Sequence, residues 1–167
     1  MSRDLRQVEG YKKDMLLDQL GRAAINLVRR HRGRHSRVTL GVRILLTDQG
    51  RVLLVRHRLL GGWYLPGGGV ERDETLEQAA RRELLEETSA SVGVLTLHGV
   101  FSNFHDGASD HVVVFRGEGA ATPRPADLEI AEACWFKLAD LPPDLSPGTV
   151  RRLHERERGD GPLVGIW

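Results

Sequence analysis

The chain has 167 residues, of which 40% are hydrophobic and 28% charged, and its formal net charge is +1. This length and composition predict one compact domain, and they exclude a wholly disordered chain and a bilayer-spanning apolar run. With Cys134 as the one cysteine, an internal disulfide framework and a multi-cysteine zinc site are also excluded.

Charge is distributed unevenly along the chain. Residues 1–37 hold ten Lys and Arg against four acids, a net charge of +6, which leaves −5 for the remainder. An acidic body argues against a nucleic-acid-binding module with a broad basic face, and it fits carboxylates gathered around a cation. The opening residues, MSRDLRQVEG, lack the apolar core of a secretion signal, so we expect a cytoplasmic protein.

The first predicted element is an amphipathic helix over residues 11–32. Apolar residues such as Leu16, Leu20 and Leu27 recur at helical spacing, with Lys and Arg between them. We therefore divide the chain into a basic helical extension, 1–36, and a domain, 37–167. The helix has three possible roles: packing on its own domain or a partner subunit, lying on an anionic membrane, or contacting nucleic acid or substrate phosphate. We expect packing, with a homodimer favoured over membrane or nucleic-acid contacts.

The next two elements are predicted strands. Residues 38–47 and 51–57 are rich in β-branched and aliphatic side chains, and the turn sequence Asp48-Gln49-Gly50 separates them. This pattern predicts a β-hairpin. The Gly- and Pro-rich stretch 61–69 is expected to be a short strand entering a loop.

Residues 75–88 are predicted to form the second helix. Thr75 is placed to cap its N-terminus, with Gln78 as the capping-box partner. The remaining segments are predicted strands at 92–103, 111–118 and 130–137, a Pro-interrupted loop at 121–129, and a charged helix at 149–158. Strands before and after a central helix, with helices at both ends, predict a mixed sheet sandwiched between helices, an α/β fold.

The predicted helix 75–88 carries an unusual acidic face. Glu83, Glu86 and Glu87 stand at i, i+3 and i+4, where like charges destabilise an isolated helix. A divalent cation would offset that repulsion, because Mg²⁺ and Mn²⁺ prefer carboxylate oxygens. Arg82 is placed to hold a carboxylate in one rotamer, and the run Gly67-Gly68-Gly69 lets backbone approach a ligand closely. A solvated acidic helix after a flexible loop is the alternative.

This segment resembles the signature of the Nudix hydrolases, G-x5-E-x7-R-E-U-x-E-E-x-G-U, where U is a bulky aliphatic residue. Two residues depart from it: Ser89 stands at the final Gly, and Ala90 is a small aliphatic residue. Both come after the acidic cluster, so the metal site is not affected. The matching positions, at the family's spacing, are Gly68, Glu74, Arg82, Glu83, Leu84, Glu86 and Glu87.

The resemblance implies a Nudix fold, an α/β/α sandwich with a mixed sheet, over roughly residues 37–158. It implies metal-dependent hydrolysis of a nucleoside diphosphate linked to another group, with water attacking phosphorus and Mg²⁺ or Mn²⁺ as the cofactor. Carried over to this sequence, Arg82 orients the glutamates, while Glu74 helps to pin the loop to the helix. The metal ligands implied are Glu83, Glu86, Glu87, the Gly67 carbonyl and the loop acid Glu129, with Glu132 as its alternate; the first three also serve as water activators.

Substrate contacts are assigned to residues that flank the predicted site. Arg43 and Arg56 are candidate phosphate ligands, Trp63 is a candidate for stacking a base, and Gly68 allows close backbone approach. Solvent-facing charge and buried aromatic packing are the alternatives. The sequence leaves the nucleotide substrate open among ADP-ribose, nucleoside triphosphates, dinucleoside polyphosphates and sugar nucleotides. Two other functions also stay open: a non-catalytic nucleotide-binding regulatory module, and a pyrophosphohydrolase acting on RNA 5′ ends.

Overall fold

A computed structural model describes residues 38–105, 108–159 and 161–167 of the chain. The helix expected at 11–32, and with it the whole basic extension, lies outside the described residues. The elements are, in chain order, β1 (Val38–Asp48), β2 (Arg51–His57), α2 (Leu76–Thr88), β3 (Leu95–His105), β4 (Ala108–Glu118), β5 (Ile130–Lys137), α3 (Pro147–Arg158) and β6 (Leu163–Ile166).

Strands β1 and β2 form the predicted hairpin. They pair antiparallel, with Asp48 opposite Arg51 at the turn. Gln49 and Gly50 both have positive φ, 43° and 77°, as a two-residue turn requires if its twist is to match that of the strands. The turn residues therefore set the register in which β2 leaves β1.

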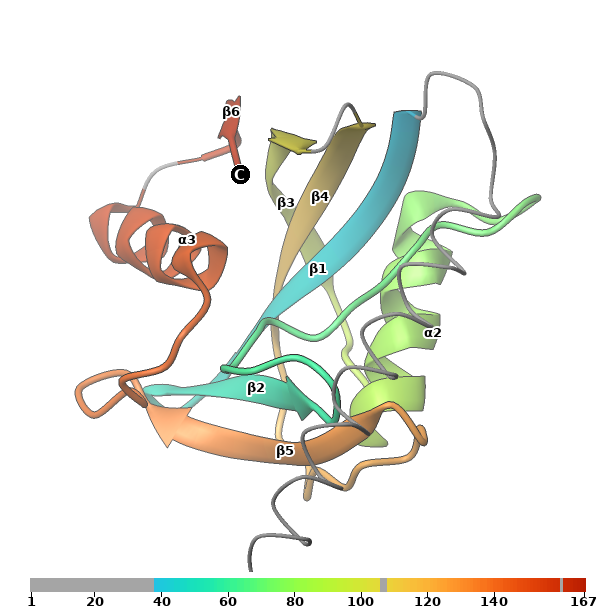
Figure 1. Ribbon diagram of the computed structural model, residues 1–167. Coiled ribbons are helices and arrows are strands. Elements are labelled where there is room, and N and C mark those ends of the chain that lie inside the picture. The colour runs from blue at the N-terminus through green and yellow to red at the C-terminus, as the bar shows by residue number, and fades with distance from the viewer. Residues whose placement is uncertain (1–37, 106–107, 160) are drawn as a thin grey trace, which may run out of the picture. The chain divides into compact units, whose positions relative to one another are not determined.

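The described strands join in one mixed sheet, as the order of the predicted elements suggested. Its strand order is β5-β2-β1-β4-β3-β6, with parallel pairs at β1–β4 and β3–β6 (Figure 1). Strand β5 begins and ends at the predicted residues, 130 and 137. Strand β6 was not expected, because four residues at the end of the sequence give too short a pattern to distinguish a strand from a loop.

The two described helices cover opposite faces of the sheet (Figure 1). On one face, the buried α2 residues Ala80 and Leu84 pack with Val42 and Ile44 of β1. On the other face, Leu153 of α3 packs in the cluster that contains Leu45. Alternation along β1 thus assigns its side chains to the two layers in turn, which is the expected sandwich. Neither of these helices is long and apolar enough to cross a bilayer.

Several boundaries differ from the prediction. The third strand runs from Leu95 to His105 rather than over 92–103, and the fourth begins at Ala108 rather than at residue 111. The last helix begins at Pro147, where Ser146 caps it. The stretch 61–69 makes isolated bridges instead of a continuous strand, since Trp63, Tyr64 and Gly69 each pair with a different segment. Loop backbone around residues 66–68 is consequently drawn against β1, where the acidic helix also packs.

Candidate active site

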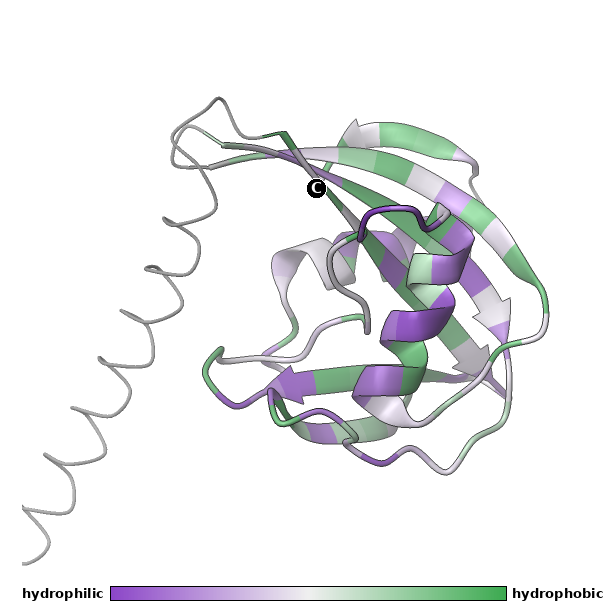
Figure 2. Ribbon diagram, turned by 90° about the vertical axis from the view of Figure 1, so that its right-hand side faces the viewer, coloured by the Kyte–Doolittle hydropathy of each residue, from purple (hydrophilic) through white to green (hydrophobic). Residues whose placement is uncertain are grey.

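Helix α2 positions the acidic residues. Its N-cap is Thr75, whose hydroxyl accepts the Gln78 amide N–H while the Gln78 side chain accepts the Thr75 N–H, so the predicted capping box is confirmed. Its apolar residues turn toward the sheet, and the face of α2 seen in Figure 2 is largely hydrophilic. This fixed start and fixed apolar face hold the acidic residues over the loop that precedes the helix.

Arg82 connects the glutamates that the signature spacing brings together. Its guanidinium donates two hydrogen bonds to Glu74, at 2.7 and 3.1 Å, and one each to Glu83 at 2.8 Å and Glu86 at 3.0 Å. A further bond, 3.0 Å long, reaches the Gly69 carbonyl. The Arg82 hydrogen bonds lower the pKa of Glu74, and that carboxylate in return raises the pKa of Arg82. Arg82 therefore joins loop and helix through bonds of fixed direction.

Glu87 is the buried member of the acidic face. Its side chain is largely enclosed, with the residue 6% exposed, and its Oε2 accepts the Gly67 amide N–H at 2.8 Å. Burial raises the pKa of Glu87 to about 7, although the Gly67 hydrogen bond and the nearby Arg43 act in the opposite direction. Burial also raises the pKa of Glu83 against the effect of Arg82. Both carboxylates thus occupy a site that disfavours their charged form.

Close contacts with β1 and with α2 leave no room for a side chain at Gly67 and Gly68. Gly67 has a φ of 135°, and a Cβ there would lie 2.2 Å from the Val42 carbonyl oxygen. At Gly68, a Cβ would lie 2.5 Å from a carboxylate oxygen of Glu83. The loop is hydrogen-bonded to β1 through the Val42 N–H and the Gly68 carbonyl, 2.9 Å apart. Side chains at these positions would push the loop away from both the strand and the acidic face.

Arg43 of β1 is a second cation, after Arg82, whose charge acts on this acidic cluster. The side chain is partly buried, and its desolvation lowers the pKa of the guanidinium, whereas Glu87 and Glu83 raise it. An arginine remains charged in such a site. The structure therefore brings together four of the predicted groups, namely the Arg82 network, Glu83, Glu87 and Arg43, together with the glycine loop.

The donor set fits a divalent cation. Three carboxylates and a backbone carbonyl are hard oxygen ligands, and a cation would relieve the cost of burying Glu87. The carbonyls of Pro66, Gly68 and Gly69 accept hydrogen bonds, but that of Gly67 accepts none from the described residues. Within that part of the chain, no three acidic, His or Cys side chains already share one point. Glu83 and Glu86 bond Arg82 through Oε1 and Oε2 respectively, which leaves the other carboxylate oxygen of each for an ion.

Arg56 and Trp63 lie apart from the acidic face. Arg56 of β2 is ion-paired with Glu132 of β5, its partner in register, and its guanidinium carbon lies 5.6 Å from the Trp63 ring centroid. Trp63 is 7% exposed and packs edge-on against Phe136, with ring centroids 4.6 Å apart. Trp63 thus packs in the core, and Glu132 is engaged by a cation of its own.

The loop before β5 carries Asp127 as well as the expected Glu129, and both residues are exposed. The amide N–H of Glu129 donates to Oδ1 of Asp127 at 2.9 Å. Asp127 contributes to raising the pKa of Glu87 and acts against the burial that lowers the pKa of His57. Asp127 is therefore a second candidate for the loop acid, beside Glu129. Sequence reasoning missed it, and its position two residues before Glu129 in the same loop was the available signal.

Comparisons with known proteins place these features in context. A family model described as NUDIX domain matches residues 35–155. A MutT-like protein from Streptomyces ambofaciens is 32% identical over 130 residues, covering 78% of this chain and 82% of the relative. The human 8-oxo-dGDP phosphatase NUDT18 is 31% identical over 133 residues, covering 72% of this chain but only 40% of that protein. Among solved structures, the NUDIX domain of Shewanella oneidensis NrtR complexed with ADP ribose superposes with a TM-score of 0.64 and 26% identity, covering 75% of this chain and 91% of that one.

Proposed function

The chain belongs to the Nudix family and is a hydrolase acting on pyrophosphate bonds; from this premise we propose that it cleaves a nucleoside diphosphate linked to another group, with Mg²⁺ or Mn²⁺ as its cofactor and water attacking phosphorus. The observation that carries the proposal is the Arg82 network over a buried Glu87. Arg82 pairs with Glu83 and Glu86, and burial disfavours the charged form of Glu87, so this face carries more carboxylates than Arg82 alone neutralises. Such a cluster has a chemical use if a cation and a polyphosphate complete it.

The residues that would hold the ion are Glu83, Glu86, Glu87 and the Gly67 carbonyl. A bound divalent cation neutralises pyrophosphate charge and lowers the pKa of a coordinated water. Arg82 and Glu74 act as positioning residues, because their bidentate pair fixes the loop relative to α2.

Arg43 and Glu87 are assigned further roles, in binding a phosphate and in activating the water. Arg43 is close enough to the acidic cluster for the charges of Glu87 and Glu83 to act on it, so we assign it to a phosphate oxygen through a charge-assisted hydrogen bond. In Glu87, Oε2 accepts the Gly67 amide N–H, which leaves Oε1 either to bind the ion or to take a proton from the attacking water. We assign the supporting loop acid to Asp127, with Glu129 as the alternative.

The substrate class is inferred from the relatives. One binds ADP ribose and another is named for 8-oxo-dGDP, so both share a nucleoside diphosphate portion. We propose that the site recognises this portion. Residues around the acidic face determine which attached groups are accepted.

A substrate panel tests the proposal. ADP-ribose, 8-oxo-dGDP, nucleoside triphosphates, dinucleoside polyphosphates and sugar nucleotides are incubated with the full chain and Mg²⁺ or Mn²⁺, in ¹⁸O-labelled water. We expect release of a nucleoside phosphate with ¹⁸O bound to phosphorus. Glu86→Gln and Glu87→Gln serve as inactive controls and Glu77→Gln, on an exposed position of α2, as the active control. Cleavage that leaves ¹⁸O on carbon, or survives in both inactive controls, would refute the mechanism.

A further inference from the structure

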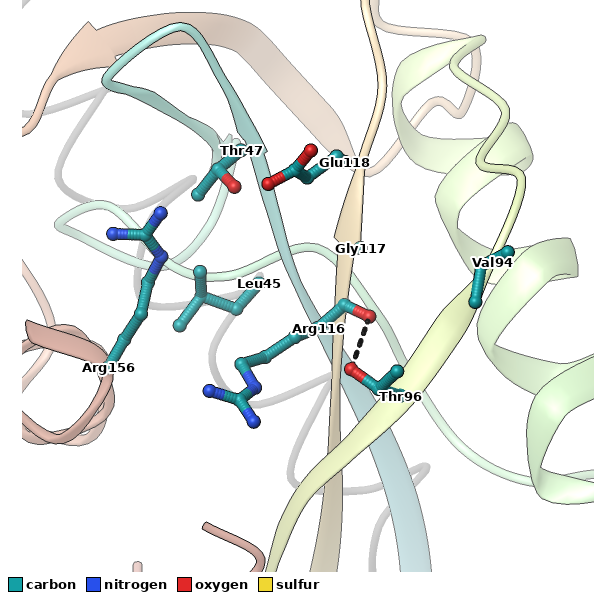
Figure 3. A pocket seen from close by; sticks show the side chains of 8 residues that line it. All are labelled: Leu45, Thr47, Val94, Thr96, Arg116, Gly117, Glu118 and Arg156. Carbon is teal, nitrogen blue, oxygen red and sulfur yellow. Dashed lines mark hydrogen bonds between the residues drawn. The ribbon is translucent and has the colours of Figure 1, made fainter. Parts of the chain in front are cut away.

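A cavity lies on the face of the sheet that carries α3. Its volume is about 660 Å³. Six of the side chains and backbone positions that line it come from the ends of three strands and from α3 (Figure 3): Leu45, Thr47, Thr96, Arg116, Glu118 and Arg156. None of these belongs to the acidic cluster, which is built around α2 on the opposite face of the sheet.

Strand register explains how the cavity floor forms. Arg116 of β4 lies opposite Leu45 of β1 on one side and Thr96 of β3 on the other. One row further along, Thr47 lies opposite Glu118. Leu45 packs in the α3-side cluster, so paired residues in both rows point to that face.

Helix α3 forms one wall of the cavity and is fixed to the sheet by hydrogen bonds and ring packing. Arg152 of α3 is 1% exposed, donates two hydrogen bonds to Glu155 at 2.6 and 2.7 Å, and stacks 3.5 Å from the centroid of the Phe101 ring. Glu155 in turn bonds to the buried ring of His98 on β3 at 3.1 Å. Arg156 follows directly on this anchored turn, so its backbone has a fixed position over the sheet.

Charge in the cavity is unbalanced. Arg116 and Arg156 project from opposite sides toward it (Figure 3), and neither guanidinium makes a hydrogen bond or ion pair with the described residues. Glu118 is the one carboxylate in the lining, which leaves a net positive charge. The Thr47 hydroxyl, on a residue that is 5% exposed, also makes no hydrogen bond to the described part of the chain. Two cations and a hydroxyl without partners match the donors that a phosphate group requires.

We propose that this cavity binds a phosphate-bearing anion between Arg116 and Arg156, with the Thr47 hydroxyl donating to the same phosphate. Free phosphate and the phosphate of a mononucleotide share this chemistry, and the volume admits either. In a mononucleotide, Glu118 would accept a hydrogen bond from a ribose hydroxyl. The inference does not rest on the hydrolase activity, because the cavity shares no residue with the acidic cluster.

The test is titration calorimetry on the full chain in excess chelator, so that no cation bridges phosphate to the acidic cluster. The probes are inorganic phosphate, AMP and adenosine. We expect phosphate and AMP to bind and adenosine not to bind. Arg116→Gln and Arg156→Gln should each weaken binding by about tenfold or more. Arg151→Gln removes the same charge from an exposed position of α3 and should leave affinity within about twofold.

Backbone amide NMR shifts identify the location and do not depend on the variants folding. Phosphate added to the wild-type chain should shift the amides of Thr47, Thr96 and Gly117. Shifts confined to Gly67–Gly69 would overturn the proposal, as would equal loss of affinity in Arg151→Gln and Arg156→Gln. Absence of phosphate binding at tens of millimolar, or equal binding of adenosine and AMP, would overturn it too. If AMP binds much more tightly than phosphate, the mononucleotide is the ligand.

Discussion

The substitution Glu87→Gln tests whether the Glu87 carboxylate is functional or structural. Glutamine has the same shape, and its side-chain oxygen can still accept the Gly67 amide N–H that Glu87 accepts at 2.8 Å. What it removes is the charge. A pKa raised from 4.5 to about 7 means that the folded state disfavours ionised Glu87 by roughly 3 kcal/mol. The exchange should therefore stabilise the fold while abolishing activity.

The sign of the pH dependence follows from this shift. Because the folded-state pKa is the higher one, protonated Glu87 favours the folded state below about pH 4.5. That contribution is lost as the pH rises through about 7. In excess chelator, the wild-type chain and Glu87→Gln should thus be nearly equal in stability at pH 4. Above pH 8 the variant should be more stable by up to about 3 kcal/mol, or several degrees in Tm.

Urea unfolding followed by circular dichroism, from pH 4 to 9 with chelator, measures this difference. With Mg²⁺ restored, kcat of Glu87→Gln should fall by about 10²- to 10⁴-fold. Glu77→Gln, which removes an exposed α2 carboxylate paired with Arg81, is the control and should change stability by only a few tenths of a kcal/mol. If Glu87→Gln is less stable at high pH, or its stability difference is independent of pH, the burial argument is wrong.

Three other outcomes are expected. Turnover should stop in excess chelator and return with Mg²⁺ or Mn²⁺, and undiminished turnover would remove the metal-dependent mechanism. Ser89→Gly should raise the free energy of unfolding by up to about 1 kcal/mol in denaturant titration. Ser89 ends α2 with a φ of 56°, a conformation that costs glycine little. A loss of stability would contradict this. Deleting residues 1–36 should dissociate a homodimer in sedimentation while kcat stays within a few-fold, and a full-length chain that sediments as a monomer would refute the dimer.

Local sequence patterns determined much of the site. The acidic residues, Arg82 and the Thr75 cap all belong to one helix, where a period of 3.6 residues fixes which side chains share a face. The hairpin was equally local, because Gln49 and Gly50 supply the positive φ values that a two-residue turn needs. These features depend on neighbours a few residues away, and sequence spacing describes such neighbours directly.

The contacts across the sheet were decided by tertiary structure. Gly67 reaches Glu87 across 20 residues, and the glycine loop pairs with β1, the strand that carries Arg43. The same holds for the loop before β5, where a hydrogen bond from the Glu129 amide to Asp127 orders two acids that the sequence does not rank.

Strand register decided which other distant residues come together. Arg116 and Thr47 are far apart in the sequence, yet they share a cavity because β1 pairs parallel to β4, and a shift by one residue would send their side chains to the other face. Trp63 shows the converse. Its aromatic ring is of a type that stacks on a base, but the bridge to Leu145 and the packing on Phe136 bury it. The sequence by itself thus determined the family, through its resemblance to the Nudix signature, and the acidic helix and the order of strands and helices, through local periodicity. Tertiary structure alone decided which distant residues complete the site, because that depends on register and packing rather than on spacing along the chain.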